Sequence, residues 1–224
     1  MTDIKLNDLD IEDIGDVIPA VEDSYGFRFG DTELEEVKTF GELCDIIVDK
    51  LKHLNNSDDC TSQQAFYKLR DSIATVLHVD KSTISTATLL LKFFPLLSRR
   101  QRVKQIERHL GFKIKILRPT YLETASLIIF LFGSFIALFF NWKIGLAGLL
   151  FSIGGVRISN YFANTLTLQT VGQVADKMSR ESYLQSRRNP STINKKEIEN
   201  KIKDLFADKL RLSKTALTKD ATFL

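Results

Sequence analysis

The hydrophobic and polar positions of this chain separate one long apolar region from a series of shorter amphipathic segments. Residues 124–140 contain no charge, and after the polar turn Asn141-Trp142-Lys143 a second uncharged stretch covers 144–156. A helix of seventeen residues is about 26 Å long, close to the ~30 Å hydrocarbon core of a bilayer. The pattern predicts a two-helix transmembrane hairpin over residues 120–162.

The same apolar stretches fit two other structures. Two buried helices of a soluble core would need a large surrounding protein, and a shallow re-entrant hairpin would suit the short spans. If both helices cross, the short turn returns the chain to the side it came from. Because the flank over residues 99–118 is rich in Lys and Arg, the positive-inside rule predicts a two-pass protein with both termini cytoplasmic.

Small residues recur at helical spacing in both apolar stretches. Gly133 and Ala137 share one face of the first helix, and Gly148, Ser152 and Gly155 share one face of the second. Small side chains let helix backbones approach closely in lipid, so they predict a packed hairpin. The alternative is that glycine is merely tolerated in an apolar helix.

Outside the hairpin, apolar residues recur every three or four positions, which predicts amphipathic helices and an all-α fold. The chain also repeats itself there without gaps. The matched pairs are LHVDKSTIS (77–85) with LRLSKTALT (210–218), VEDSYGFRF (21–29) with IERHLGFKI (106–114), and TFGELCD (39–45) with TVGQVAD (170–176).

The order of these segments resembles the acyl carrier protein family, a small four-helix bundle. Residues 197–224 resemble the family's first helix and the loop after it, and residues 18–47 resemble its second to fourth helices. The resemblance implies two carrier-like bundles around the membrane hairpin. The expected parts are 1–55 (helices II–IV) paired with 195–224 (helix I), a second bundle from 63–118 and 164–182, the inserted hairpin 120–162, and a linker 183–194.

The pairing of the two chain ends has two arrangements. The ends fold together within one chain as a permuted bundle, or they exchange between neighbouring chains and make a homo-oligomer.

The resemblance implies a phosphopantetheine on a serine in the motif Asp-Ser-Leu, and this chain departs from that motif. Ile11 stands at the serine position of the N-terminal copy, and isoleucine has no hydroxyl. In the central copy Ser98 lies near the right place, but no Asp precedes it and no Leu follows it. We expect Ser98 to be the N-cap of a helix over 99–110 and the chain to carry no cofactor, with Ser98 as the one phosphopantetheine candidate.

Charge is distributed unevenly along the chain. Residues 1–59 carry five Lys and Arg against seventeen Asp and Glu, and the remainder carries twenty-six against eleven. The basic part predicts contact with anionic lipid head groups, the alternative being a solvated face; no nucleic-acid motif is present. The expected membrane contacts are Arg99, Arg100, Arg102, Lys104, Arg108, Trp142 and Arg157.

The acidic N-terminal part predicts a surface for a protein partner, through Asp10, Glu12, Asp13 and Asp16, although such a cluster can also be merely solvated. Neither the two cysteines nor the three histidines have the spacing of a metal or catalytic site. We therefore expect a non-enzymatic, membrane-anchored, acyl-carrier-like protein that acts in scaffolding or recruitment. The alternatives are a working acyl carrier modified at Ser98 and a small pore-forming or toxin-like membrane protein.

Overall fold

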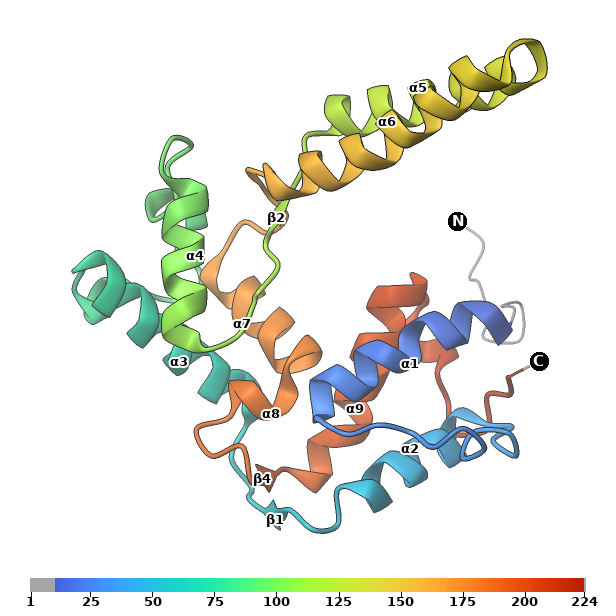
Figure 1. The fold of residues 1–224 in the computed structure, drawn as a ribbon. Helices are drawn as coiled ribbons and strands as arrows, with labels where there is room; N and C mark the ends of the chain where they lie inside the picture. The colour runs from blue at the N-terminus through green and yellow to red at the C-terminus, as the bar shows by residue number, and fades with distance from the viewer. Residues whose placement is uncertain (1–10, 224) are drawn as a thin grey trace. The chain divides into compact units, whose positions relative to one another are not determined.

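The computed structural model describes residues 11–223, with the side chains of residues 11–14 left out. Nine α-helices and four two-residue strands lie in this range, which confirms the all-α fold class. The chain divides into two compact units, shown in Figure 1. Among the described residues, the terminal unit contains 11–72, 80–86 and 171–223, and the hairpin unit contains 73–79 and 87–170.

The terminal unit is built from both ends of the chain and part of its middle. Its elements are α1 (Ile11–Tyr25), α2 (Phe40–Lys50), β1 (Asn55–Asn56), the first part of α3 (Thr61–Leu77), the 3-10 turn η2 (Lys81–Thr83), α7 (Val171–Glu181), α8 (Tyr183–Ser186), β4 (Thr192–Ile193), α9 (Lys195–Leu210) and the 3-10 turn η4 (Lys214–Ala216).

Helices from opposite ends of the chain share one hydrophobic core in this unit. Val21 of α1, Ile47 of α2 and Phe206 of α9 are fully buried in it. The rings of Phe40 and Phe206 meet edge to face, with centroids 5.3 Å apart. Figure 1 shows α1, α2 and α9 side by side. The amphipathic faces of the N- and C-terminal segments therefore cover each other within a single chain.

The backbones of the two ends also meet where α2 begins. Thr39 and Glu42 form a capping box, in which each side chain accepts a hydrogen bond from the other residue's backbone N–H. The Phe40 N–H donates to the Ala221 carbonyl over 2.8 Å. A Cβ on Gly41 would lie 2.8 Å from the carbonyl oxygen of Lys219, so only glycine permits this approach.

Residues 183–194, which the sequence suggested as a linker, form part of the terminal core. Tyr183 and Ile193 are fully buried there. Strand β4 pairs in parallel with β1, with Thr192 opposite Asn55. This segment looked like a linker because its buried residues show no helical or strand periodicity.

The hairpin unit contains the end of α3, the 3-10 turn η3 (Leu90–Lys92), α4 (Arg99–Leu110), β2 (Leu117–Arg118), α5 (Tyr121–Phe140), α6 (Trp142–Tyr161) and β3 (Thr165–Leu166). Strands β2 and β3 pair antiparallel, with Leu117 opposite Leu166. The chain therefore enters and leaves the α5–α6 hairpin at one place.

Small residues allow α5 and α6 to approach closely. A Cβ on Gly148 would lie 2.3 Å from the Oγ of Ser134, and a Cβ on Gly155 would lie 2.6 Å from the side chain of Leu127. Ser152 is also buried between the helices. Gly133 does not contribute, because a Cβ there would meet no atom within 4 Å.

Of the two helices predicted to cross a membrane, only one has the length and composition for it. Among the described residues, α5 alone is long and apolar enough to cross a membrane. Helix α6 has the same length of twenty residues. Its glycines, together with Lys143, Arg157 and Asn160, lower its mean hydropathy.

The second predicted bundle is divided between the two units. Helix α4 belongs to the hairpin unit, and α7 belongs to the terminal unit, where it packs on α8 and α9. Whether residues 63–118 and 164–182 form one carrier-like bundle stays a prediction.

Candidate functional site

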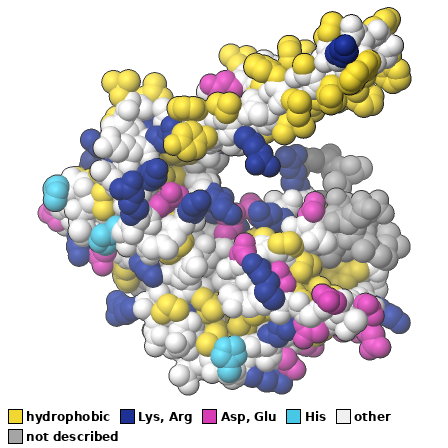
Figure 2. Space-filling model, viewed as in Figure 1, with side chains coloured by type: hydrophobic (Ala, Val, Ile, Leu, Met, Phe, Trp, Pro, Cys, Tyr) yellow, Lys and Arg dark blue, Asp and Glu magenta, His cyan; other side chains and the backbone are white. Residues whose placement is uncertain are grey.

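The outer surface of the α5–α6 hairpin is almost entirely apolar and exposed. Nearly all of the apolar residues of helix α5 are exposed. Within the described residues, α5 is therefore not a helix buried in a hydrophobic core. Figure 2 shows hydrophobic side chains along the whole hairpin. The most exposed of its large side chains are Tyr121, Leu122, Ile129, Phe132, Phe139, Phe140, Trp142, Ile144, Leu150, Phe151 and Tyr161.

Aromatic residues lie at both ends of the hairpin. Trp142 is 64% exposed at the turn between the helices, with the Lys143 ammonium 6.0 Å from its ring centroid. At the other end, the Arg100 guanidinium lies 4.6 Å from the ring centroid of Tyr161 and 5.0 Å from that of Phe162. Aromatic rings paired with cations are typical of membrane–water interfaces.

Two of the arginines predicted to contact lipid hydrogen-bond to backbone carbonyls, and one of them, Arg99, is buried and so is not a lipid contact here, whereas Arg102 is half-buried. Arg99 is buried, its Nε donates to the Phe94 carbonyl over 3.0 Å, and its Nη1 donates to the Asn164 carbonyl over 2.6 Å. Arg102 donates to the Phe93 carbonyl over 2.8 Å. These guanidiniums donate hydrogen bonds to backbone carbonyls in the segments before α4 and after α6. The sequence pattern could not distinguish them from exposed arginines.

The remaining predicted contacts are available at the surface. Lys104, Arg108 and Arg157 are exposed, and Arg100 is half-buried against the aromatic rings described above. Their contact with lipid head groups stays a prediction.

Ser98 lies at the N-cap position of α4, as predicted, but its hydroxyl makes no capping hydrogen bond. Its surroundings do not fit a phosphopantetheine site of the acyl carrier type. Leu97 before it is fully exposed, and Arg99 after it is buried and hydrogen-bonded to backbone carbonyls.

Most of the predicted acidic partner surface cannot be placed. Asp10 and the side chains of Glu12 and Asp13 lie outside the described residues. Asp16 is exposed on α1.

A buried polar cluster, missed by sequence reasoning, lies in the terminal unit. Arg187 is fully buried, and its Nη1 donates to Thr61 Oγ1 over 2.5 Å and lies 3.6 Å from Glu197 Oε1. Glu197 also accepts from the Tyr183 hydroxyl over 3.0 Å and from the hydroxyl of Thr61. Burial raises the pKa of Tyr183. This cluster joins α3, α8 and α9, and a lone arginine in an irregular segment gives no sequence signal for it.

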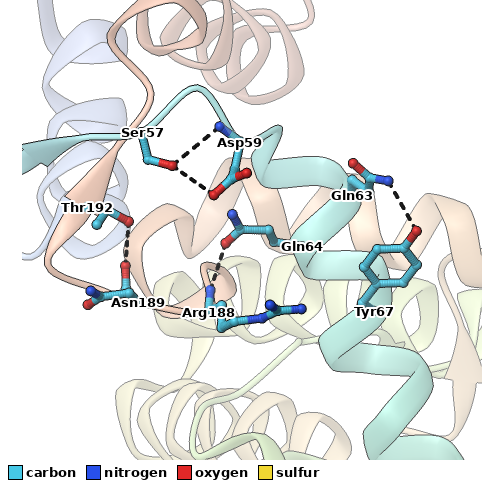
Figure 3. Close-up of a pocket in the computed structure, with 8 residues that line it drawn as sticks. All are labelled: Ser57, Asp59, Gln63, Gln64, Tyr67, Arg188, Asn189 and Thr192. Carbon is cyan, nitrogen blue, oxygen red and sulfur yellow. Dashed lines mark hydrogen bonds between the residues drawn. The ribbon is translucent and has the colours of Figure 1, made fainter.

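A polar pocket of about 240 Å³ opens beside this cluster (Figure 3). Several of its side chains pair with one another or with nearby backbone. Ser57 donates to Asp59 over 2.8 Å, and Gln63 donates to the Tyr67 hydroxyl over 3.1 Å. Gln64 accepts from the Arg188 N–H over 2.8 Å. The described residues hold no metal-binding cluster of His, Cys, Asp or Glu.

Comparison of the chain with protein-family models, with curated proteins and with solved structures gave no match.

Proposed function

We propose that the chain is a non-enzymatic, membrane-anchored protein that holds acyl-carrier-like bundles at the cytoplasmic face for scaffolding or recruitment. The observation that carries the proposal is the exposed apolar surface of the α5–α6 hairpin. Exposed apolar patches of this extent mark contact with a membrane or another protein. Twenty helical residues span about 30 Å, which matches the hydrocarbon core.

The finer topology is a two-pass hairpin with both termini cytoplasmic. Helix α6 is too weakly apolar to qualify as a span by itself, and its close packing on α5 lets the two insert together. The tight turn at Asn141 and the β2–β3 ladder keep both flanks on one side. The excess of Lys and Arg near the hairpin selects the cytoplasmic side.

The recruitment role rests on the resemblance to acyl carriers. The repeats match carrier-like helices, whereas Ile11 and Ser98 lack the Asp-Ser-Leu context that the resemblance requires for the prosthetic group. The bundles would then act through their surfaces, and enzymes that handle fatty-acyl groups are the partner class that the family resemblance favours.

The decisive experiment places charge on the exposed hairpin face. Phe132→Lys with Ile136→Lys changes two side chains that are 66% and 59% exposed. A charged residue costs roughly 2.5–3.5 kcal/mol near the centre of a membrane helix and almost nothing on a solvated surface. We expect the full-length chain to remain in carbonate-washed membranes and the double variant to be lost from them.

The matched control places two lysines at exposed positions of the terminal unit, by Glu36→Lys with His53→Lys, and should stay in the membrane fraction. Recovery of the unaltered chain in the soluble fraction, monodisperse without detergent, would contradict the proposal.

Two further experiments test the alternative functions. A mass gain of one phosphopantetheine after incubation with a phosphopantetheinyl transferase would identify a working carrier. Leakage of vesicles at low protein concentration would identify a pore.

A further inference from the structure

Four leucines of the hairpin unit lie exposed in the segment that leads into α4. Their neighbours Leu90, Phe93 and Phe94 are buried, so the segment has one face packed inward and one left uncovered. We call the exposed set the leucine turn: Leu89, Leu91, Leu96 and Leu97.

The exposure of the leucine turn is unfavourable in water. Leu96 is 61% exposed and Leu97 is 102% exposed. Covering a leucine side chain fully contributes about 1.5–3 kcal/mol, so the turn favours a medium or partner that removes it from water.

The leucine turn is fixed to the base of the hairpin by hydrogen bonds. Asn164, which follows α6, donates through Nδ2 to the Leu96 carbonyl over 3.0 Å. The Asn164 carbonyl accepts from Arg99 over 2.6 Å. Arg100 follows Arg99 in α4, and its guanidinium lies over the exposed rings of Tyr161 and Phe162. The leucine turn therefore lies beside the base of the hairpin.

The charge around the leucine turn favours an anionic surface. The hairpin unit carries eleven Lys and Arg, and its only acidic residues are Glu107 and Glu123. Lys92 and Arg100 lie within the turn and directly after it. Apolar side chains flanked by cations are the arrangement that binds at the boundary between head groups and acyl chains.

We infer that the leucine turn is a second membrane contact, inserted into the head-group boundary of the anionic leaflet that the hairpin enters. This inference rests on the proposed function, since the hairpin brings the turn to the lipid. A lipid surface is favoured over a protein partner because the turn is hydrogen-bonded to the base of the hairpin and the unit carries a large excess of basic residues. Two separate attachments would fix the orientation of the hairpin unit on the membrane.

The test uses tryptophan fluorescence in the full-length chain, whose only tryptophan is Trp142. The variant Trp142→Phe with Leu97→Trp is reconstituted into vesicles of phosphatidylcholine and phosphatidylglycerol that carry bromine near the head-group end of the acyl chains. We expect blue-shifted emission from the new tryptophan and loss of most of its intensity to the bromine.

A matched control uses Trp142→Phe with Lys113→Trp. Lys113 is exposed and lies beyond the far end of α4, which at twelve residues is about 18 Å long. This tryptophan should emit as in water and keep its intensity.

The outcomes separate the two proposals. Quenching of native Trp142, at the hairpin turn, in vesicles brominated near the head-group end of the acyl chains, with water-like and unquenched emission at position 97, would overturn the leucine turn and leave the hairpin anchor in place. Blue-shifted but unquenched emission at position 97 would show that protein covers the turn and would also overturn it. If neither position is quenched, the membrane anchor fails too.

Discussion

Single residues in this chain hold segments together where the sequence shows no regular pattern. Arg187 is fully buried. Its guanidinium hydrogen-bonds to Thr61 of α3 and forms an ion pair with Glu197 of α9. Gly26 and Gly111 adopt the left-handed conformation directly after α1 and α4, a position where local rules favour glycine. The glycines could be anticipated from local rules, whereas the role of Arg187 depends on Thr61, which lies 126 positions away in sequence.

Glu197→Ala should destabilise the terminal unit because it leaves the buried Arg187 guanidinium without its carboxylate. Removing one partner of a buried ion pair costs about 3–5 kcal/mol. We expect a loss of that size in guanidinium-induced unfolding of the detergent-solubilised chain. Glu36→Ala, at an exposed position, is the control, and an equally small loss for both variants would show that the buried pair contributes little.

The two cysteines should differ strongly in reactivity. Burial raises the pKa of the Cys44 thiol to about 12, so at pH 8 about one part in ten thousand is thiolate, the reactive form. Because the folded-state pKa is raised, the fraction of reactive Cys44 stays small until the pH approaches that value or the unit unfolds. Cys60 is exposed. Thiol labelling at pH 8 should modify Cys60 rapidly and Cys44 only with denaturant; rapid labelling of both would contradict the buried position of Cys44.

At the scale of single elements, the hairpin depends on small residues at specific positions. Gly148 packs against Ser134 of α5, whereas a Cβ on Gly133 would have no neighbour within 4 Å. Sequence spacing placed both glycines at the interface, because periodicity gives the face of a helix but not the rotation of that face towards its neighbour.

Gly148→Leu should weaken the packing of α5 on α6, and Gly133→Leu should leave it intact. Overfilling a packed contact costs typically about 1–3 kcal/mol. Unfolding of each variant in mixed micelles with increasing sodium dodecyl sulfate should show an earlier transition for Gly148→Leu alone. Equal transitions for both variants would argue against the interface described here.

At the scale of the whole molecule, the two ends of the chain depend on each other for burial. Phe206 of α9 packs on Phe40 of α2, and the backbone of residues 219–223 pairs with residues 38–41. The terminal unit therefore brings together segments separated by most of the chain length, with the hairpin between them in sequence.

Phe206→Ala should loosen the N-terminal helices as well as α9. Truncating a buried phenylalanine costs about 3–5 kcal/mol through lost transfer energy and the cavity left behind. Limited proteolysis should then cut within residues 40–52, which the intact chain protects. Phe223→Ala changes a partly buried residue and serves as the milder control. Unchanged protection of residues 40–52 in the Phe206 variant would reject the shared core.

The sequence by itself determined the helical class, the position of the apolar hairpin, the helix-ending glycines and the absence of an Asp-Ser-Leu motif. These features depend on side-chain type and local periodicity, which physical chemistry links directly to helices, caps and lipid solubility. Only the tertiary structure decided which arginines are buried, which glycines face a partner helix and which leucines remain uncovered. Those properties depend on contacts between residues far apart in sequence, and no local pattern records how such segments are oriented when they meet.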